Sequence, residues 1–116
     1  MNKIKCTLNI SNEDLEDLLE TAFIRSEYWL YITKTKHKGG FNYDLFVPED
    51  DKNYWEENRE IGKYSLTKRK LLKGLQQFIE TYGCKIEDGS IDVCSIDGCD
   101  CDLILQFALF GEQVYG

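Results

Sequence analysis

The stretch over residues 100–116 limits the possible folds of this chain more than any other part of the sequence. It contains the run Leu-Ile-Leu-Gln-Phe-Ala-Leu-Phe, in which the amide of Gln106 is the one polar side chain. A helix that is apolar on all sides is normally buried. Gly111 follows the run as a typical helix stop. We therefore expect a helix over residues 100–110 that lies in the core of the domain or against a partner.

The rest of the sequence predicts an α+β fold in one domain, residues 1–116. About three helices are expected to pack on a small antiparallel or mixed sheet, in the order β-α-β-β-α-(β)-α. In the first half we expect a half-buried strand over 4–10, a helix over 12–25 that is capped by Ser11 and packs on a sheet, and strands over 28–36 and 41–47 around a turn at 38–40. An acidic loop over 49–62 follows. In the second half we expect a helix over 67–82 that ends at Gly83, a short strand or loop around 91–93, and the last helix over 100–110.

The charge and the hydrophobic content of the chain limit its partners. The formal net charge is −7, so we expect no direct binding to nucleic acid, whereas basic proteins are favoured partners. The N-terminal residues do not resemble a signal peptide, and no apolar run is long enough to cross a bilayer. We expect a cytoplasmic protein with no membrane partner, and reduced thiols at its five cysteines.

Two clusters of residues near the C-terminus resemble metal sites. The cysteines follow the spacing C-x9-C-x4-C-x-C and could bind zinc, but they lack the usual C-x2-C pairs; they are Cys84, Cys94, Cys99 and Cys101. The aspartates around Gly98 could bind calcium, but the glycine precedes the close pair instead of following it; they are Asp92, Asp97, Asp100 and Asp102. The simpler interpretation is ordinary cysteines, and a helix capped by Asp100 and Asp102. We predict no metal site and no cofactor.

No catalytic motif is present in the sequence. The only histidine, His37, lies between two lysines beside a predicted turn, where it is expected to be solvated. A cysteine nucleophile paired with His37 is an alternative that spacing alone does not test. There is no nucleophile elbow, phosphate-binding loop or metalloprotease helix. We expect a protein that is not an enzyme.

The first two predicted helices carry opposite charges in unfavourable places. The first has carboxylates at helical spacing and no cation before Arg25; they are Glu13, Asp14, Glu16, Asp17 and Glu20. Each like-charge neighbour destabilises the helix by a few tenths of a kcal/mol, roughly. The second helix begins with cations, which oppose the helix dipole; they are Lys68, Arg69 and Lys70.

These charges have three interpretations. The carboxylates could imitate the phosphates of a nucleic acid and bind a basic protein. The cations could bind the phosphate of an anionic nucleotide at the start of the second helix. Alternatively, the two charged surfaces neutralise each other within the monomer or across a symmetric homodimer.

Aromatic side chains gather in the middle of the chain and are candidate binding residues. Exposed Trp and Tyr often anchor interfaces, and they can also stack on a base. We predict partner-binding roles for Trp29 and Tyr31, and for Trp55 if the ligand is a nucleotide. The alternative is that these aromatic residues belong to the core.

Two segments resemble a family of small, largely uncharacterised proteins carried by phages, prophages and other mobile elements. The first is Ile10-Ser-Asn-Glu-Asp-Leu-Glu-Asp-Leu-Leu-Glu-Thr-Ala-Phe23, followed by Tyr28-Trp29. The second is Asp102-Leu-Ile-Leu-Gln-Phe-Ala-Leu-Phe-Gly-Glu-Gln-Val-Tyr-Gly116. Together they cover about a third of the chain. The resemblance implies a phage setting, in which small acidic proteins often act against host defence, and it implies no catalytic residues.

These expectations lead to one main hypothesis and one alternative. The main hypothesis is a non-enzymatic inhibitor of a host defence system, of anti-CRISPR type, which binds a host protein or ribonucleoprotein complex. Its predicted partner-binding residues are Glu13, Glu16, Asp17, Glu20, Trp29 and Tyr31. The alternative is a small module that sequesters a cyclic or signalling nucleotide. Its predicted ligand-binding residues are Lys68, Arg69, Lys70 and Trp55.

Overall fold

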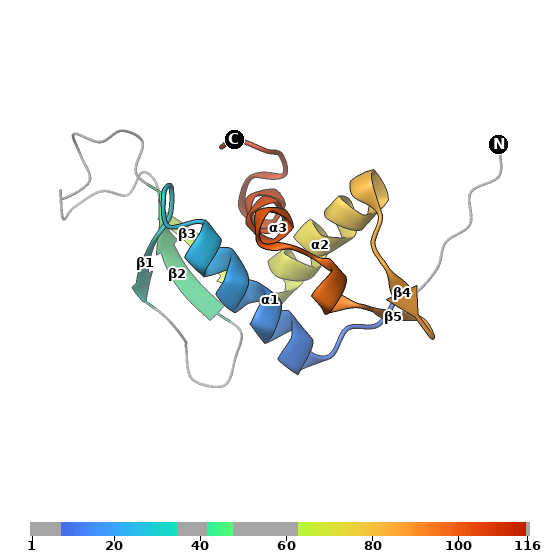
Figure 1. Ribbon diagram of the computed structural model, residues 1–116. Coiled ribbons are helices and arrows are strands. Elements are labelled where there is room, and N and C mark those ends of the chain that lie inside the picture. Colours follow the sequence, from blue (N-terminus) through green and yellow to red (C-terminus); the bar gives the residue numbers. More distant parts are fainter. Residues whose placement is uncertain (1–7, 35–41, 48–62, 116) are drawn as a thin grey trace.

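The computed structural model describes residues 8–34, 42–47 and 63–115, and these residues form an α+β fold (Figure 1). This confirms the fold class expected from the sequence. The elements, in chain order, are α1 (Asn12–Arg25), β1 (Tyr31–Lys34), β2 (Asn42–Phe46), β3 (Lys63–Thr67), α2 (Lys68–Tyr82), β4 (Ile86–Glu87), β5 (Ser90–Ile91), the 3-10 turn η2 (Val93–Ser95) and α3 (Gly98–Phe110).

The strands form two small antiparallel sheets at opposite ends of the helical layer (Figure 1). One sheet has the strand order β1-β2-β3, and the other is the β4–β5 hairpin. The chain before α1 joins the hairpin through a single parallel bridge between Asn9 and Ser90. This bridge is the described part of the strand expected over residues 4–10.

Helix α3 lies between α1 and α2 and packs against both of them. This position explains its apolar sequence, because a helix covered on two sides has most of its surface buried. Its buried residues include Ile104 and Leu105, which are in the same core as Leu18 of α1 and Leu75 of α2. The expectation that the C-terminal helix is buried is therefore confirmed, and it is buried within the domain itself.

Helix α1 packs chiefly on α3, and not on a sheet as expected. It also reaches the sheet near its C-terminal end, where the rings of Phe23 and Tyr43 meet edge-on with their centroids 5.2 Å apart. The sequence could not distinguish these partners, because the stripe of leucines on α1 fits an apolar helix as well as a sheet.

The helix ends agree with the caps expected for α1 and α2. Ser11 Oγ accepts a hydrogen bond from the backbone N–H of Asp14, and Thr67 Oγ1 accepts one from that of Lys70. Gly111 ends α3 in the left-handed conformation, with φ of 74°.

The start of α3 corrects one prediction. The N-cap is Asp97, whose Oδ1 accepts from the backbone N–H of Asp100. Asp100 therefore lies in the first turn of the helix and does not cap it. Asp102 is buried and has a different role, described below.

Two strands also differ from the expected ones. β1 starts at Tyr31 because Trp29 and Leu30 form a turn, donating their backbone N–H groups to the carbonyl of Ser26. β3 was not expected, although Tyr64 and Leu66 alternate with polar residues as strand residues do. The turn at 38–40, the acidic loop over 49–62, His37 and Trp55 lie outside the described residues.

In the described part of the chain, no helix is long and apolar enough to cross a membrane.

Candidate protein-binding surface

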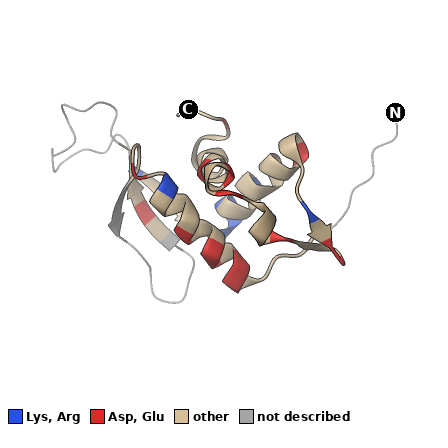
Figure 2. Ribbon diagram, viewed as in Figure 1, with Lys and Arg blue, Asp and Glu red and all other residues tan. Residues whose placement is uncertain are grey.

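Helix α1 has an inner side and an outer side. The side chains buried in the core are Leu15, Leu18, Leu19 and Ala22. At 3.6 residues per turn, the opposite side carries Glu13, Glu16, Asp17, Glu20 and Ile24, all of them exposed. We call the four carboxylates among these residues the acidic face. Figure 2 shows the acidic residues in red along the first half of α1.

The spacing of charge on the acidic face is close to that of a nucleic-acid strand. From Glu13 to Glu20 the helix rises by about 10 Å, at about 1.5 Å per residue. The four carboxylates divide this length into three unequal steps that average about 3.5 Å of helix axis, compared with one phosphate per about 3.4 Å along each strand of a DNA duplex. A surface of this kind repels nucleic acid and attracts the basic grooves that bind it.

Two exposed apolar residues follow the acidic face in sequence: Ile24 in the last turn of α1 and Tyr28 in the turn after it. The side chain of Ile24 is 66% exposed and that of Tyr28 is 61% exposed. The Tyr28 hydroxyl nevertheless points inward and donates to Oδ2 of Asp102 at 2.7 Å. Burial of this end of the side chain, and then the hydrogen bond to Asp102, raise the pKa of Tyr28 to about 12.

Asp102 holds together the turn that follows α1 and helix α3. Its Oδ1 accepts from Ser26 Oγ at 3.0 Å, from Trp29 Nε1 at 2.8 Å and from Gln106 Nε2 at 3.2 Å. Among the described residues, every buried side-chain nitrogen or oxygen has a hydrogen-bond partner. The carboxylate therefore completes a buried polar network and fixes the position of Tyr28.

Trp29 is a core residue, which corrects its predicted role in partner binding. It is 4% exposed, and its indole N–H is bonded to Asp102. Its ring stacks on Tyr115 with centroids 5.1 Å apart and planes 10° apart. The aromatic residue that does reach the surface is its neighbour Tyr28, which sequence reasoning did not select. The side chain of Tyr31 lies outside the described residues.

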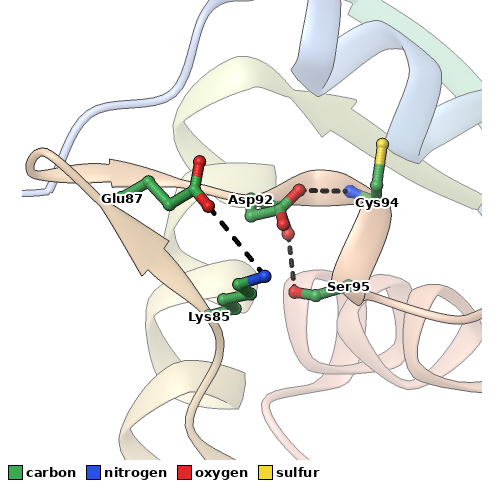
Figure 3. Close-up of polar contacts among 5 residues, drawn as sticks. All are labelled: Lys85, Glu87, Asp92, Cys94 and Ser95. Carbon is green, nitrogen blue, oxygen red and sulfur yellow. Dashed lines mark hydrogen bonds and ion pairs between the residues drawn. The ribbon is translucent and has the colours of Figure 1, made fainter.

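An open cavity of about 370 Å³ lies between the start of α1 and the β4–β5 hairpin. Its carboxylates are Asp14, Glu87, Asp88 and Asp92. Figure 3 shows that two of them have partners nearby: Glu87 lies 3.9 Å from the Lys85 ammonium, and Asp92 Oδ1 accepts from the backbone N–H of Cys94 at 3.1 Å. The cavity continues the negative charge of α1, and Asp92 serves to cap η2.

The basic start of α2 is exposed and is a separate surface. Lys68, Arg69 and Lys70 are all exposed, and the Lys70 ammonium donates to the carbonyl of Ser65 at 2.6 Å. This contact turns one of the three cations back onto β3. Trp55, the aromatic partner expected for a nucleotide here, lies outside the described residues.

The cysteines and aspartates near the C-terminus do not assemble into a metal site. In the described segments, no group of three or more His, Cys, Asp or Glu side chains could hold an ion. Cys94 and Cys99 are exposed, whereas Cys101 is buried, and burial raises the pKa of its thiol to about 11. Asp97 caps α3 and Asp102 bonds to the turn after α1, so the aspartates have separate structural roles.

Comparison with known proteins adds no assignment: no protein-family model, curated protein or solved structure matches this chain. The phage family and the anti-CRISPR role therefore stay predictions. The proposed function therefore rests on the exposed carboxylates of the acidic face of α1.

Proposed function

We propose that this chain is a non-enzymatic binding protein that inhibits a host defence system by occupying a basic groove on one of its proteins. The observation that carries the proposal is the acidic face, because its four exposed carboxylates give an average charge per length of axis close to that of a nucleic-acid strand. The helix dipole favours Glu13 in the first turn of α1, but like-charge neighbours farther along weaken the helix. A binding role accounts for carboxylates that continue beyond the first turn.

The proposed setting is a phage or prophage, and the proposed target is a nucleic-acid-guided nuclease or a comparable ribonucleoprotein complex. The setting rests on the resemblance of the first helix and the C-terminal segment to phage proteins. The target class rests on charge, since a groove that binds nucleic acid is the commonest strongly basic surface of such a complex.

The first prediction concerns charge reversal on the acidic face. Glu13→Lys combined with Asp17→Lys places two cations on the face, so we expect inhibition to fall by at least about tenfold, as for charge pairs at other steered interfaces. The readout is phage plating on cells that carry a CRISPR–Cas system and a matching spacer. Affinity capture of the tagged chain from those cells identifies the protein whose binding is then measured.

A matched control separates the acidic face from net charge. Glu80→Lys combined with Glu112→Lys changes the net charge equally, at exposed positions on α2 and in the tail. We expect this variant to inhibit as the wild type does. Equal inhibition by both double variants would show that the acidic face is not the binding surface.

The nucleotide alternative predicts a different result. Binding of a cyclic dinucleotide at Lys68 and Arg69 would raise the melting temperature of the wild type, and Arg69→Ala would remove the rise. We expect no such rise, because the acidic face and not the α2 cations is the proposed binding surface.

A further inference from the structure

Ile24 and Tyr28 form an apolar surface at the end of the acidic face. They lie four residues apart, and both are more than half exposed. Single exposed apolar residues are common on proteins, but here one is in the last turn of α1 and the other in the turn that follows, close in sequence to the carboxylates, and apolar residues beside a polar rim are typical of interfaces. Glu27, also exposed, continues the negative charge beside them.

A hydrogen bond fixes the side chain of Tyr28 while its ring stays exposed. Its hydroxyl bonds to the buried carboxylate of Asp102, while its ring remains open to solvent. A partner that covers this ring would therefore not have to immobilise a free side chain, which is a substantial part of the entropy cost of association. Rigid aromatic side chains of this kind are frequent binding hot spots.

The basic residue in the last turn of α1 does not interrupt the surface. Arg25 packs over the start of α3, where a Cβ added to Gly98 would meet its guanidinium. The outer side of α1 therefore presents carboxylates followed by an apolar end, with Arg25 turned toward α3.

We propose that Ile24 and Tyr28 are the apolar anchor of the interface, and that the partner is a protein whose basic groove ends at an apolar pocket. A groove that binds single-stranded nucleic acid holds the phosphates with its cations and stacks bases on apolar or aromatic side chains. The acidic face would take the place of the phosphates and the Tyr28 ring that of a base. This inference rests on the proposed function and specifies the chemistry of its partner.

The two parts of the surface should respond differently to salt. Attraction between the acidic face and a basic groove weakens as salt rises. Burial of Ile24 and Tyr28 is a hydrophobic contribution that salt at these concentrations leaves almost unchanged. Loss of the anchor should therefore lower affinity equally at all salt concentrations, whereas loss of carboxylates should also reduce the salt dependence.

The test uses fluorescein-labelled peptides as probes. One peptide is oligoarginine, and two others carry the same arginines extended by a Leu-Trp pair at the N- or the C-terminus. Fluorescence anisotropy gives their affinities for the intact protein at several salt concentrations. We expect all three to bind at low salt, and one extended peptide to bind at least about tenfold more tightly than oligoarginine, as for a buried aromatic hot spot.

Single substitutions test whether the tighter binding of the extended peptide depends on Ile24 and Tyr28. We expect Ile24→Ser and Tyr28→Ala each to remove most of the gain, and Tyr28→Phe, which keeps the ring but loses its bond to Asp102, to retain only part of it. Ile86→Ser is the matched control, because Ile86 is 45% exposed but lies on the β4–β5 hairpin. Ile24 makes no side-chain hydrogen bond, so its variant also tests the anchor without disturbing Asp102.

Each other outcome overturns a particular claim. Equal binding of all three peptides, or a gain that survives Ile24→Ser and Tyr28→Ala, overturns the anchor and leaves the proposed function standing. Absence of binding by oligoarginine at low salt contradicts the proposed function itself.

Discussion

At the scale of single residues, Asp102 links parts of the chain that are far apart in sequence. Its partners Ser26, Tyr28 and Trp29 lie more than seventy residues earlier. A buried carboxylate is stable only when donors surround it. The same residue thus stabilises the junction between α1 and α3 and orients the exposed ring of Tyr28.

Substitution of Asp102 should lower stability in a defined order. In Asp102→Leu, the buried donors of Ser26 and Trp29 lose their acceptor, and each unpaired donor costs about 1–3 kcal/mol, whereas Gln106 keeps its bond to the Tyr115 carbonyl. Asp102→Asn should cost less, because its Nδ2 can donate to the Tyr28 oxygen. Urea unfolding measures the difference, with Asp100→Asn as a control. If Asp102→Leu is as stable as the control, the network does not hold the fold together.

Tyr28 should make stability depend on pH in the alkaline range. Its pKa is raised from 10.0 in the unfolded chain to about 12 in the folded protein. A raised pKa stabilises the fold fully below pH 10, and this contribution is lost as pH rises toward 12. The stability difference between wild type and Tyr28→Phe should therefore shrink over that interval. A difference that is constant from pH 9 to 12 in urea unfolding contradicts this assignment.

At the scale of elements, the crossing of α2 and α3 requires a glycine. A Cβ on Gly74 would lie 2.6 Å from the carbonyl oxygen of Ile104 and 2.7 Å from the backbone nitrogen of Ala108. Both are backbone atoms, so the helices themselves would have to separate. A small residue at this position therefore sets how closely the two helices approach.

Gly74→Ala should destabilise the protein in spite of its better helix propensity. Overpacking costs about 1–3 kcal/mol, and alanine recovers at most about 1 kcal/mol of helix propensity. Gly98→Ala is a matched control in α3, because the three atoms nearest to its Cβ all belong to the flexible side chain of Arg25. We expect urea unfolding to show a loss for Gly74→Ala and little change for Gly98→Ala. The reverse order would mean that the crossing is looser than described.

The sequence was sufficient to predict the helices but not their contacts. Ser11, Thr67 and Gly111 mark helix ends through local hydrogen bonds and backbone conformation, which a sequence shows directly. The bonds of Asp102 join distant segments and leave no periodic signal, so Asp102 looked like a helix cap and Trp29 like a surface residue. The embedded Gln106 was the one available sign that a buried polar network was present.

At the scale of the whole molecule, apolar contacts and charge occupy different places. α3 forms the centre, and the chain after it folds back, so that Tyr115 stacks on Trp29 and also lies near Phe110. The carboxylates of the acidic face remain outside this core. Under the proposed function, a stable core thus carries a helix whose outer side serves binding and tolerates some loss of stability.

Gln106 should be the residue that holds the C-terminal tail, residues 112–115, against α3. Its Oε1 accepts from the backbone N–H groups of Val114 and Tyr115 at 2.9 and 2.8 Å, and its Nε2 donates to the carbonyl of Tyr115. Gln106→Met keeps the volume but leaves these groups unpaired, which costs about 1–3 kcal/mol for each group that stays buried. We expect the tail to detach instead, and hydrogen exchange at both amides to accelerate.

Gln113→Ala is the matched control for detachment of the C-terminal tail. Gln113 Nε2 also donates to the Tyr115 carbonyl, at 3.2 Å, but from an exposed position within the tail itself. Its loss should leave exchange at Val114 and Tyr115 nearly unchanged, because the bonds from Gln106 remain. Because release uncovers Trp29, Gln106→Met should also shift the tryptophan emission to longer wavelength. Slow exchange in both variants would mean that stacking of Tyr115 on Trp29 holds the tail without Gln106.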